Sequence, residues 1–137
     1  MLDESELAGL TEEDVRRIAL ALPGAIEGTD DFAFSVENRG KHKAFLWSWK
    51  ERVAPKQPRV PRDDVIAVRV VNNEDKQALL ASGNEAFFTE PHYNGFPAIL
   101  VRLAAVDVDD LRELITNAWR CQAPPALVKG FDSHDVS

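Results

Sequence analysis

Two runs of alternating side chains, joined by a short turn, most constrain the fold of this 137-residue chain. Phe32, Phe34 and Val36 alternate with smaller side chains, a period of two that is typical of a half-buried strand. Residues 37–40, which end in Arg-Gly, predict a turn, and residues 43–49 predict the returning strand. Neighbouring strands joined by short turns indicate an antiparallel sheet, with helices packed against it.

Further strands and helices are predicted along the rest of the chain. The strands are expected at 65–71, 86–89 and 98–103, and the helices at 11–22, 73–80 and 107–123. Each helix begins at a side chain that can cap it: Thr11 with Asp14, Asn72 or Asn73, and Asp107. The sequence therefore predicts an α+β fold with a five-stranded antiparallel sheet and helices packed on one face.

The length fits a single domain over residues 1–137, with a loose lead-in at 1–10 and a loose tail at 129–137. The one cysteine, Cys121, excludes an internal disulfide and a cysteine-based zinc site. The three histidines have no recognisable metal-ligand spacing. No signal-peptide pattern opens the chain, and no apolar run approaches the ~20 residues that span a bilayer. We expect a monomeric cytoplasmic protein that binds no cofactor, metal or membrane.

Charge is distributed unevenly along the chain, although the formal total of −7 by itself disfavours nucleic acid. The window from Arg39 to Arg62 holds eight of the 16 basic residues and one acid, so it carries +7 and the remainder −14. A basic hairpin and proline-rich loop can contact a phosphate backbone, or can simply keep an acidic protein soluble. The candidate nucleic-acid-binding residues are Arg39, Lys41, Lys43, Lys50, Arg52, Lys56, Arg59 and Arg62.

Large aromatic residues recur at every second position of the second predicted strand. Phe45, Trp47 and Trp49 are therefore expected to share one face of it. Such a face is either core beneath the helices, the more frequent case for large aromatic side chains, or an exposed platform on which bases stack. The pattern alone leaves both alternatives open.

A polar turn at Glu90, His92, Tyr93 and Asn94 is the alternative ligand site. Its side chains can line a pocket for a small molecule or a protein partner, although Pro91 and Asn94 also suit a purely structural turn. The chain has no glycine-rich phosphate loop, nucleophile elbow or paired-carboxylate spacing. We therefore expect a binding protein rather than an enzyme.

Several segments together have the pattern of a known family: Ala-Leu-Pro-Gly at 21–24, Phe-Ala-Phe at 32–34, Gly-Lys-His-Lys-Ala-Phe at 40–45, residues 89–97 followed by 99–103, and 111–123. In these segments the chain resembles the MmcQ/YjbR-like family, whose fold is frataxin-like and is also called double-wing. The similarity extends over roughly residues 11–128. It implies a frataxin-like fold and a DNA-binding role, and it supplies no catalytic residue.

Overall fold

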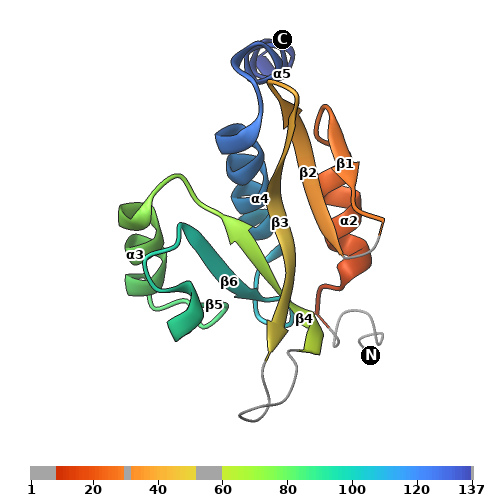
Figure 1. The fold of residues 1–137 in the computed structure, drawn as a ribbon. Helices are drawn as coiled ribbons and strands as arrows, with labels where there is room; N and C mark the ends of the chain where they lie inside the picture. The colour runs from red at the N-terminus through yellow and green to blue at the C-terminus, as the bar shows by residue number, and fades with distance from the viewer. Residues whose placement is uncertain (1–8, 30–31, 52–59, 137) are drawn as a thin grey trace, which may run out of the picture.

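The computed structural model describes residues 9–29, 32–51 and 60–136, which form an antiparallel sheet with helices around it (Figure 1). The strands are β1 (Ala25–Glu27), β2 (Ala33–Asn38), β3 (Lys41–Glu51), β4 (Val60–Arg69), β5 (Phe87–Phe88) and β6 (Ala98–Arg102). The helices are α2 (Glu12–Leu20), α3 (Asn73–Ala81), α4 (Val108–Gln122) and α5 (Pro125–Val136), with a 3-10 helix, η1, at Pro91–Tyr93. This arrangement confirms the expected α+β class.

The described part of the chain contributes six strands to the sheet, in the order β1-β2-β3-β4-β6-β5. All neighbouring pairs are antiparallel. The expectation of five strands missed β1, a three-residue edge strand in which Ala25 pairs with Val36 and Glu27 with Phe34. Three residues are too few to display a period of two, so pairing with β2 makes this segment a strand. The other strands overlap the five predicted ranges.

The helices begin at the expected caps. Thr11 and Asp14 form a reciprocal capping box, in which Thr11 N donates to Asp14 Oδ2 at 2.8 Å and Asp14 N donates to Thr11 Oγ1 at 3.4 Å. The hydrogen bond from the Thr11 backbone lowers the pKa of the Asp14 carboxyl. Asn72 and Asp107 cap α3 and α4 by accepting from backbone N–H groups in the first turn. These contacts are local, so each helix start is determined without the sheet.

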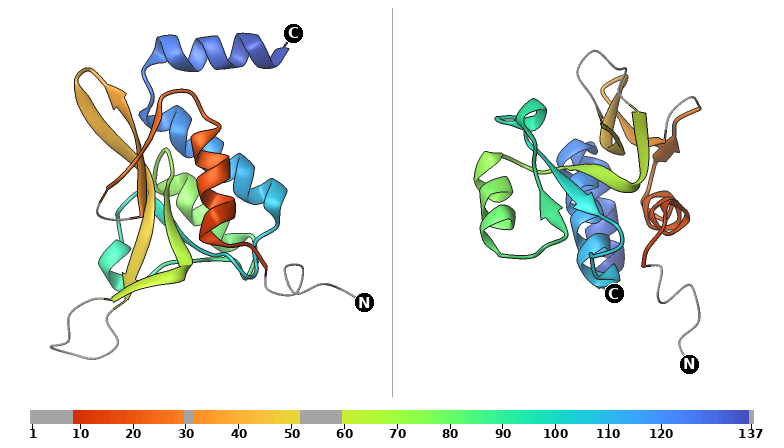
Figure 2. Two further views of the ribbon diagram at one scale, coloured as in Figure 1. Left: turned by 90° about the vertical axis from the view of Figure 1, so that its right-hand side faces the viewer. Right: turned by 90° about the horizontal axis from the view of Figure 1, so that it is seen from below.

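The helices α2 and α4 lie side by side on one face of the sheet (Figure 2), as expected for the first and last predicted helices. α4 contacts β2, β3 and β4, whereas α3 lies at the far edge and contacts β5 and β6. The helix α5 follows α4 and occupies 125–136, where we expected a loose tail from residue 129. Its apolar side chains pack against the core, and this tertiary contact orders the segment.

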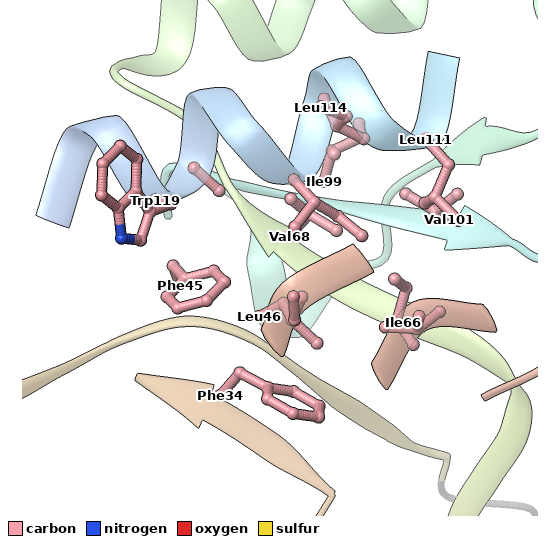
Figure 3. Packing of buried hydrophobic residues seen from close by; sticks show 14 of the residues in the cluster. Phe34, Phe45, Leu46, Ile66, Val68, Ile99, Val101, Leu111, Leu114 and Trp119 are labelled. Atoms are coloured by element: carbon pink, nitrogen blue, oxygen red, sulfur yellow. The ribbon is translucent and has the colours of Figure 1, made fainter. Parts of the chain in front are cut away.

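The main core lies between α2, α4 and the sheet (Figure 3). Trp119, Phe34 and Phe45 are its largest fully buried side chains. Trp119 Nε1 donates a hydrogen bond of 2.8 Å to the carbonyl of Pro23, which joins α4 to the connection between α2 and β1. The ring of Trp119 also meets that of Phe131 edge to face, with centroids 5.1 Å apart, and this contact holds α5.

A β-bulge at Phe45 shows that the expectation of a shared face for Phe45, Trp47 and Trp49 was wrong. Adjacent residues of β2 pair with Leu46 and Ala44, so Phe45 is an extra residue in β3. The bulge directs Phe45 and Leu46 together into the main core, where both are fully buried. Trp47 and Trp49 consequently point to the opposite face of the sheet.

A smaller apolar cluster covers that opposite face. Its buried centre is formed by Val65, Ala67 and Leu100, and the half-buried rings around it are Trp47, Trp49, Phe88 and Tyr93. Trp47 Nε1 donates to the hydroxyl of Tyr93 at 3.0 Å, and Trp49 meets Phe88 edge to face at 5.6 Å. The two tryptophans therefore belong to a second, partly covered core and do not form a flat stacking platform.

We predict that Phe45→Ala lowers the free energy of unfolding by about 3–5 kcal/mol, because it leaves a cavity in the main core. His42→Ala, at an exposed position of the same strand, is the control and is expected to change it by less than about 0.5 kcal/mol. Urea unfolding followed by circular dichroism measures both. A loss below about 1 kcal/mol for Phe45→Ala would contradict the core assignment.

Candidate nucleic-acid interface

The β2–β3 hairpin turns through the two residues Arg39 and Gly40, between the paired Asn38 and Lys41. Both turn residues have a positive φ, 55° and 77°, as in the type I′ turn that matches the twist of a hairpin. Glycine adopts this backbone freely, whereas arginine adopts it at an energetic cost. Arg39, Lys41 and Lys43 are exposed, so the tip of the hairpin presents three cations.

Two hydrogen bonds fix this hairpin against the C-terminal end of α4. Asn38 Nδ2 donates to the carbonyl of Gln122, and Gln122 Nε2 donates to the carbonyl of Ala44, each at 2.9 Å. Beyond this point α5 is held by an ion pair of 2.5 Å between Arg120 and Asp132. The hairpin, the end of α4 and α5 are thus held together near the same end of the molecule (Figure 1).

These three elements border an open hollow of about 690 Å³, which we call the basic cleft. Its charged lining consists of Arg39, Lys43, Arg120, Lys129 and Asp132. Arg120 is paired with Asp132, whereas Arg39, Lys43 and Lys129 make no ion pair within the described residues. Pro125 also lines the cleft, so the positive end of the α5 dipole lies beside it. The cleft therefore attracts anions, although the protein as a whole is acidic.

The structure divides the predicted basic window into separate groups. β3 is 11 residues long, so its two ends lie roughly 30 Å apart at about 3.3 Å per residue. Arg39, Lys41 and Lys43 lie at the hairpin end, whereas Lys50 pairs with Pro61 at the other end and Arg62 follows on β4. The remaining candidates, Arg52, Lys56 and Arg59, lie outside the described residues.

Sequence reasoning missed two cations of the basic cleft, Arg120 and Lys129. They lie about 80 residues beyond the hairpin, and no local pattern connects the two regions. One available signal was Pro125, since proline is frequent at the first position of a helix. Leu127, Val128 and Phe131 then recur at helical spacing, so a helix that carries Lys129 back towards the core was predictable.

The Glu90–Asn94 turn forms a separate and smaller site on the opposite face of the sheet. A pocket of about 260 Å³ is lined by Trp47, His92, Tyr93 and Phe96. His92 and Asn94 are exposed, and Tyr93 is half-buried. The structure thus brings two of the four predicted residues, His92 and Tyr93, to one pocket.

Glu90 stands apart from the residues that line this pocket. Its Oε1 atom is buried and has no hydrogen-bond partner among the described residues, and the same holds for Thr89 Oγ1 and Trp49 Nε1. A buried carboxylate oxygen without a donor is destabilising. Glu90 and His92 make no hydrogen bond to each other within the described residues.

Lys76 is a buried cation that the sequence did not single out. It lies on α3, is 1% exposed, and its Nζ donates to the carbonyls of Tyr93 and Phe96 at 2.5 and 2.9 Å. Asn73 Nδ2 adds a hydrogen bond of 3.1 Å to the carbonyl of Gly95. Burial lowers the pKa of the Lys76 ammonium. These contacts attach α3 to the turn that follows η1.

Within the described ranges, no group of three or more His, Cys, Asp and Glu side chains is arranged to hold a metal ion. The same residues include no helix with the length and hydropathy needed to cross a membrane.

A family model described as YjbR matches residues 20–121 of the chain. Among curated proteins, the chain is similar to the uncharacterized proteins Rv2570 of Mycobacterium tuberculosis and Mb2600 of Mycobacterium bovis. Each is 38% identical over 122 residues, which cover 88% of this chain and 95% of the relative.

Among solved structures, the chain is similar to the crystal structure of Deinococcus radiodurans protein DR2400, whose domain is described as DUF419. The TM-score is 0.58 at 19% sequence identity, and the match covers 85% of this chain and 80% of the other. At this level of identity the likeness concerns the fold alone.

We predict that Lys76→Met destabilises the protein by about 1–3 kcal/mol near neutral pH, because it removes two hydrogen bonds that the buried Nζ donates to the carbonyls of Tyr93 and Phe96. The pKa of Lys76 is lowered from its ordinary 10.5, so the unfolded chain binds this proton more tightly than the folded one. Lys76 therefore adds stability as pH rises through its lowered pKa towards 10.5. The variant lacks this gain. The difference in the free energy of unfolding between the wild type and the variant should therefore widen between about pH 7 and about pH 10.

Urea unfolding at both pH values measures this difference, with exposed Lys41→Met as the matched control. A Lys76→Met protein as stable as the wild type at both values would show that the two hydrogen bonds do not support the turn.

Proposed function

The chain belongs to the YjbR family, and on that premise we propose that it is a non-enzymatic protein that binds a nucleic-acid phosphate backbone weakly in the basic cleft. One observation carries the proposal: Arg39 and Lys43 of the hairpin, Arg120 of α4 and Lys129 of α5 converge on a single hollow. The total charge of the protein is −7, so this concentration of cations is not a property of the surface as a whole.

The binding is electrostatic and reads no base sequence. Lysine and arginine side chains position a protein on phosphates, whereas sequence is read by groups that reach base edges. The long helix α4 begins with Asp107, Asp109 and Asp110, which phosphates repel, so it is unsuited to enter a groove as a recognition helix. Trp47 and Trp49 lie on the opposite face from the cleft, so they cannot stack bases of a strand that is held there.

The expected strength follows from the number of free cations. Arg120 is already paired with Asp132, which leaves Arg39, Lys43 and Lys129 to displace counterions from phosphates. Three contacts correspond to a slope of roughly −3 in log K against log salt for duplex DNA. The acidic remainder of the protein opposes other orientations, and the affinity is on the order of micromolar or weaker at physiological salt.

The alternative, ligand binding at the Glu90–Asn94 turn, has less support. The pocket there has a volume of about 260 Å³, which is below the roughly 300–1,000 Å³ of sites that enclose drug-sized molecules. The unsatisfied Glu90 Oε1 is the observation in its favour, but that atom belongs to a residue outside the pocket lining.

We predict that Lys43→Ala combined with Lys129→Ala shallows the salt slope for duplex DNA by about two units, since two phosphate contacts are removed. Fluorescence anisotropy with labelled duplexes and single strands of random sequence, from about 25 to 200 mM salt, measures the slope. Both positions are exposed, so the fold should be unchanged. The matched control is Arg17→Ala with Arg112→Ala, which removes the same charge between α2 and α4.

A third variant tests the rest of the window. Replacing Lys56, Arg59 and Arg62 with Ala shallows the slope by about two to three units if that segment also reaches phosphates, and leaves it unchanged if the cleft acts alone. Absence of wild-type binding at about 50 mM salt, where counterion release favours it, would exclude the nucleic-acid function.

A further inference from the structure

A second large hollow lies between α3 and α4 and is mainly apolar. Its volume is about 590 Å³, within the range of sites that enclose small ligands. Val70 and Val71 immediately after β4, Leu79 of α3 and Leu114 of α4 provide apolar walls. Val71 is 59% exposed, so the hollow leaves an aliphatic side chain in water that a ligand would cover. We call this hollow the α3–α4 cleft.

The walls of the α3–α4 cleft are held apart by contacts elsewhere. Lys76 and Asn73 attach α3 to the turn after η1 through three hydrogen bonds. α4 is fixed on the other side by the burial of Leu111, Ile115 and Trp119 in the main core. Each wall of the cleft is thus anchored by contacts that lie outside the gap, in a different part of the protein.

Arg69 supplies a cation at the edge of this cleft. Arg69 is half-buried and is one of the residues that line the cleft. Its Nε donates to the carbonyl of Val70 at 3.3 Å, and its guanidinium carbon lies 5.8 Å from the centre of the Phe96 ring. Within the described residues Arg69 makes no ion pair, and its two terminal nitrogens donate no hydrogen bond.

The other charged groups at the cleft are already engaged or solvated. Arg120 is paired with Asp132. Asp75 is exposed in the first turn of α3, where its backbone N–H is capped by Asn72 and its charge suits the helix dipole. Water screens the charge of the half-buried Arg69 less than it screens the charge of the exposed Asp75. A planar guanidinium with two free donors matches a carboxylate, which it can bind through two parallel hydrogen bonds.

We propose that the α3–α4 cleft binds a small apolar monocarboxylate, such as a medium-chain acyl or aryl carboxylate, with the carboxylate on Arg69 and the apolar part between α3 and α4. The site is distinct from the proposed nucleic-acid function, because Lys43 and Lys129 of the basic cleft take no part in it. The two hollows adjoin at Arg120 and Cys121, which line both.

Cys121 provides a second readout of occupancy beside calorimetry, since it is the one cysteine of the chain and lines the cleft. Burial raises the pKa of its thiol, so alkylation by iodoacetamide is best followed at mildly alkaline pH. Octanoate is the probe, and octanol and octylamine are its neutral and cationic counterparts. Octanoate at ten times its Kd should slow the alkylation of Cys121 by roughly tenfold by mass action, and calorimetry should give the same Kd.

Two variants test the separate parts of the proposal. Arg69→Met should weaken octanoate binding by roughly tenfold or more and leave octanol binding unchanged, because only the charge-assisted contact is lost. Ala78→Phe, at an exposed position of α3 that lines the cleft, should fill the cleft and abolish binding of both. Arg112→Met, at an exposed position of α4 that faces α2 and lies outside the cleft, is the matched control and should bind octanoate like the wild type.

Three results would overturn the proposal. The first is a lack of both heat and Cys121 protection with millimolar octanoate. The second is binding of octanol or octylamine as tight as that of octanoate, which would remove the carboxylate assignment. The third is wild-type binding by Ala78→Phe with circular dichroism showing a native fold, which would place the ligand elsewhere. Lys43→Ala combined with Lys129→Ala should bind octanoate normally, so this test and the nucleic-acid test fail independently.

Discussion

The buried indole of Trp119 is the contact on which the rest of the structure depends. From α4 it lies beside Phe45 in the main core (Figure 3), donates to the carbonyl of Pro23 and holds Phe131 of α5 edge to face. It thereby joins the end of α2, the bulged strand β3 and the C-terminal helix, which are distant in sequence. Burial of a tryptophan contributes several kcal/mol, a large share of the roughly 5–15 kcal/mol that stabilises a domain.

The bulge beneath this indole determines which chemistry each face of the sheet presents. One extra residue in β3 lets Phe45 and Leu46 both enter the core and sends Trp47 to the other face. Lys43 pairs with the buried Val36 and lines the basic cleft beside α5. Lys41, Lys43, Trp47 and Trp49 all occupy odd positions, which would share one face of a regular strand. The bulge between them places Lys43 and the tryptophans on opposite faces, so they do not form a single nucleic-acid surface.

The position of α3 has a comparable effect at the other edge of the sheet. Its contacts are with β5, β6 and the turn after η1, where the buried Lys76 satisfies two backbone carbonyls. This attachment places α3 against β5 and β6, and an apolar hollow lies between α3 and α4. Arg120 and Cys121 line both this hollow and the basic cleft, so the C-terminal end of α4 is the place where the two candidate sites meet.

The sequence by itself determined the features that depend on neighbouring residues: the period of two in β2, the caps at Thr11, Asn72 and Asp107, and the α+β class. It also identified Arg39 and Lys43 as exposed cations of a hairpin. The tertiary structure alone decided the edge strand β1, the bulge at Phe45, the burial of Lys76 and the meeting of the hairpin with Arg120 and Lys129. Each of these results from contacts between segments far apart in the chain. Local periodicity carries no information about such contacts, because their free energy arises only when the segments pack together.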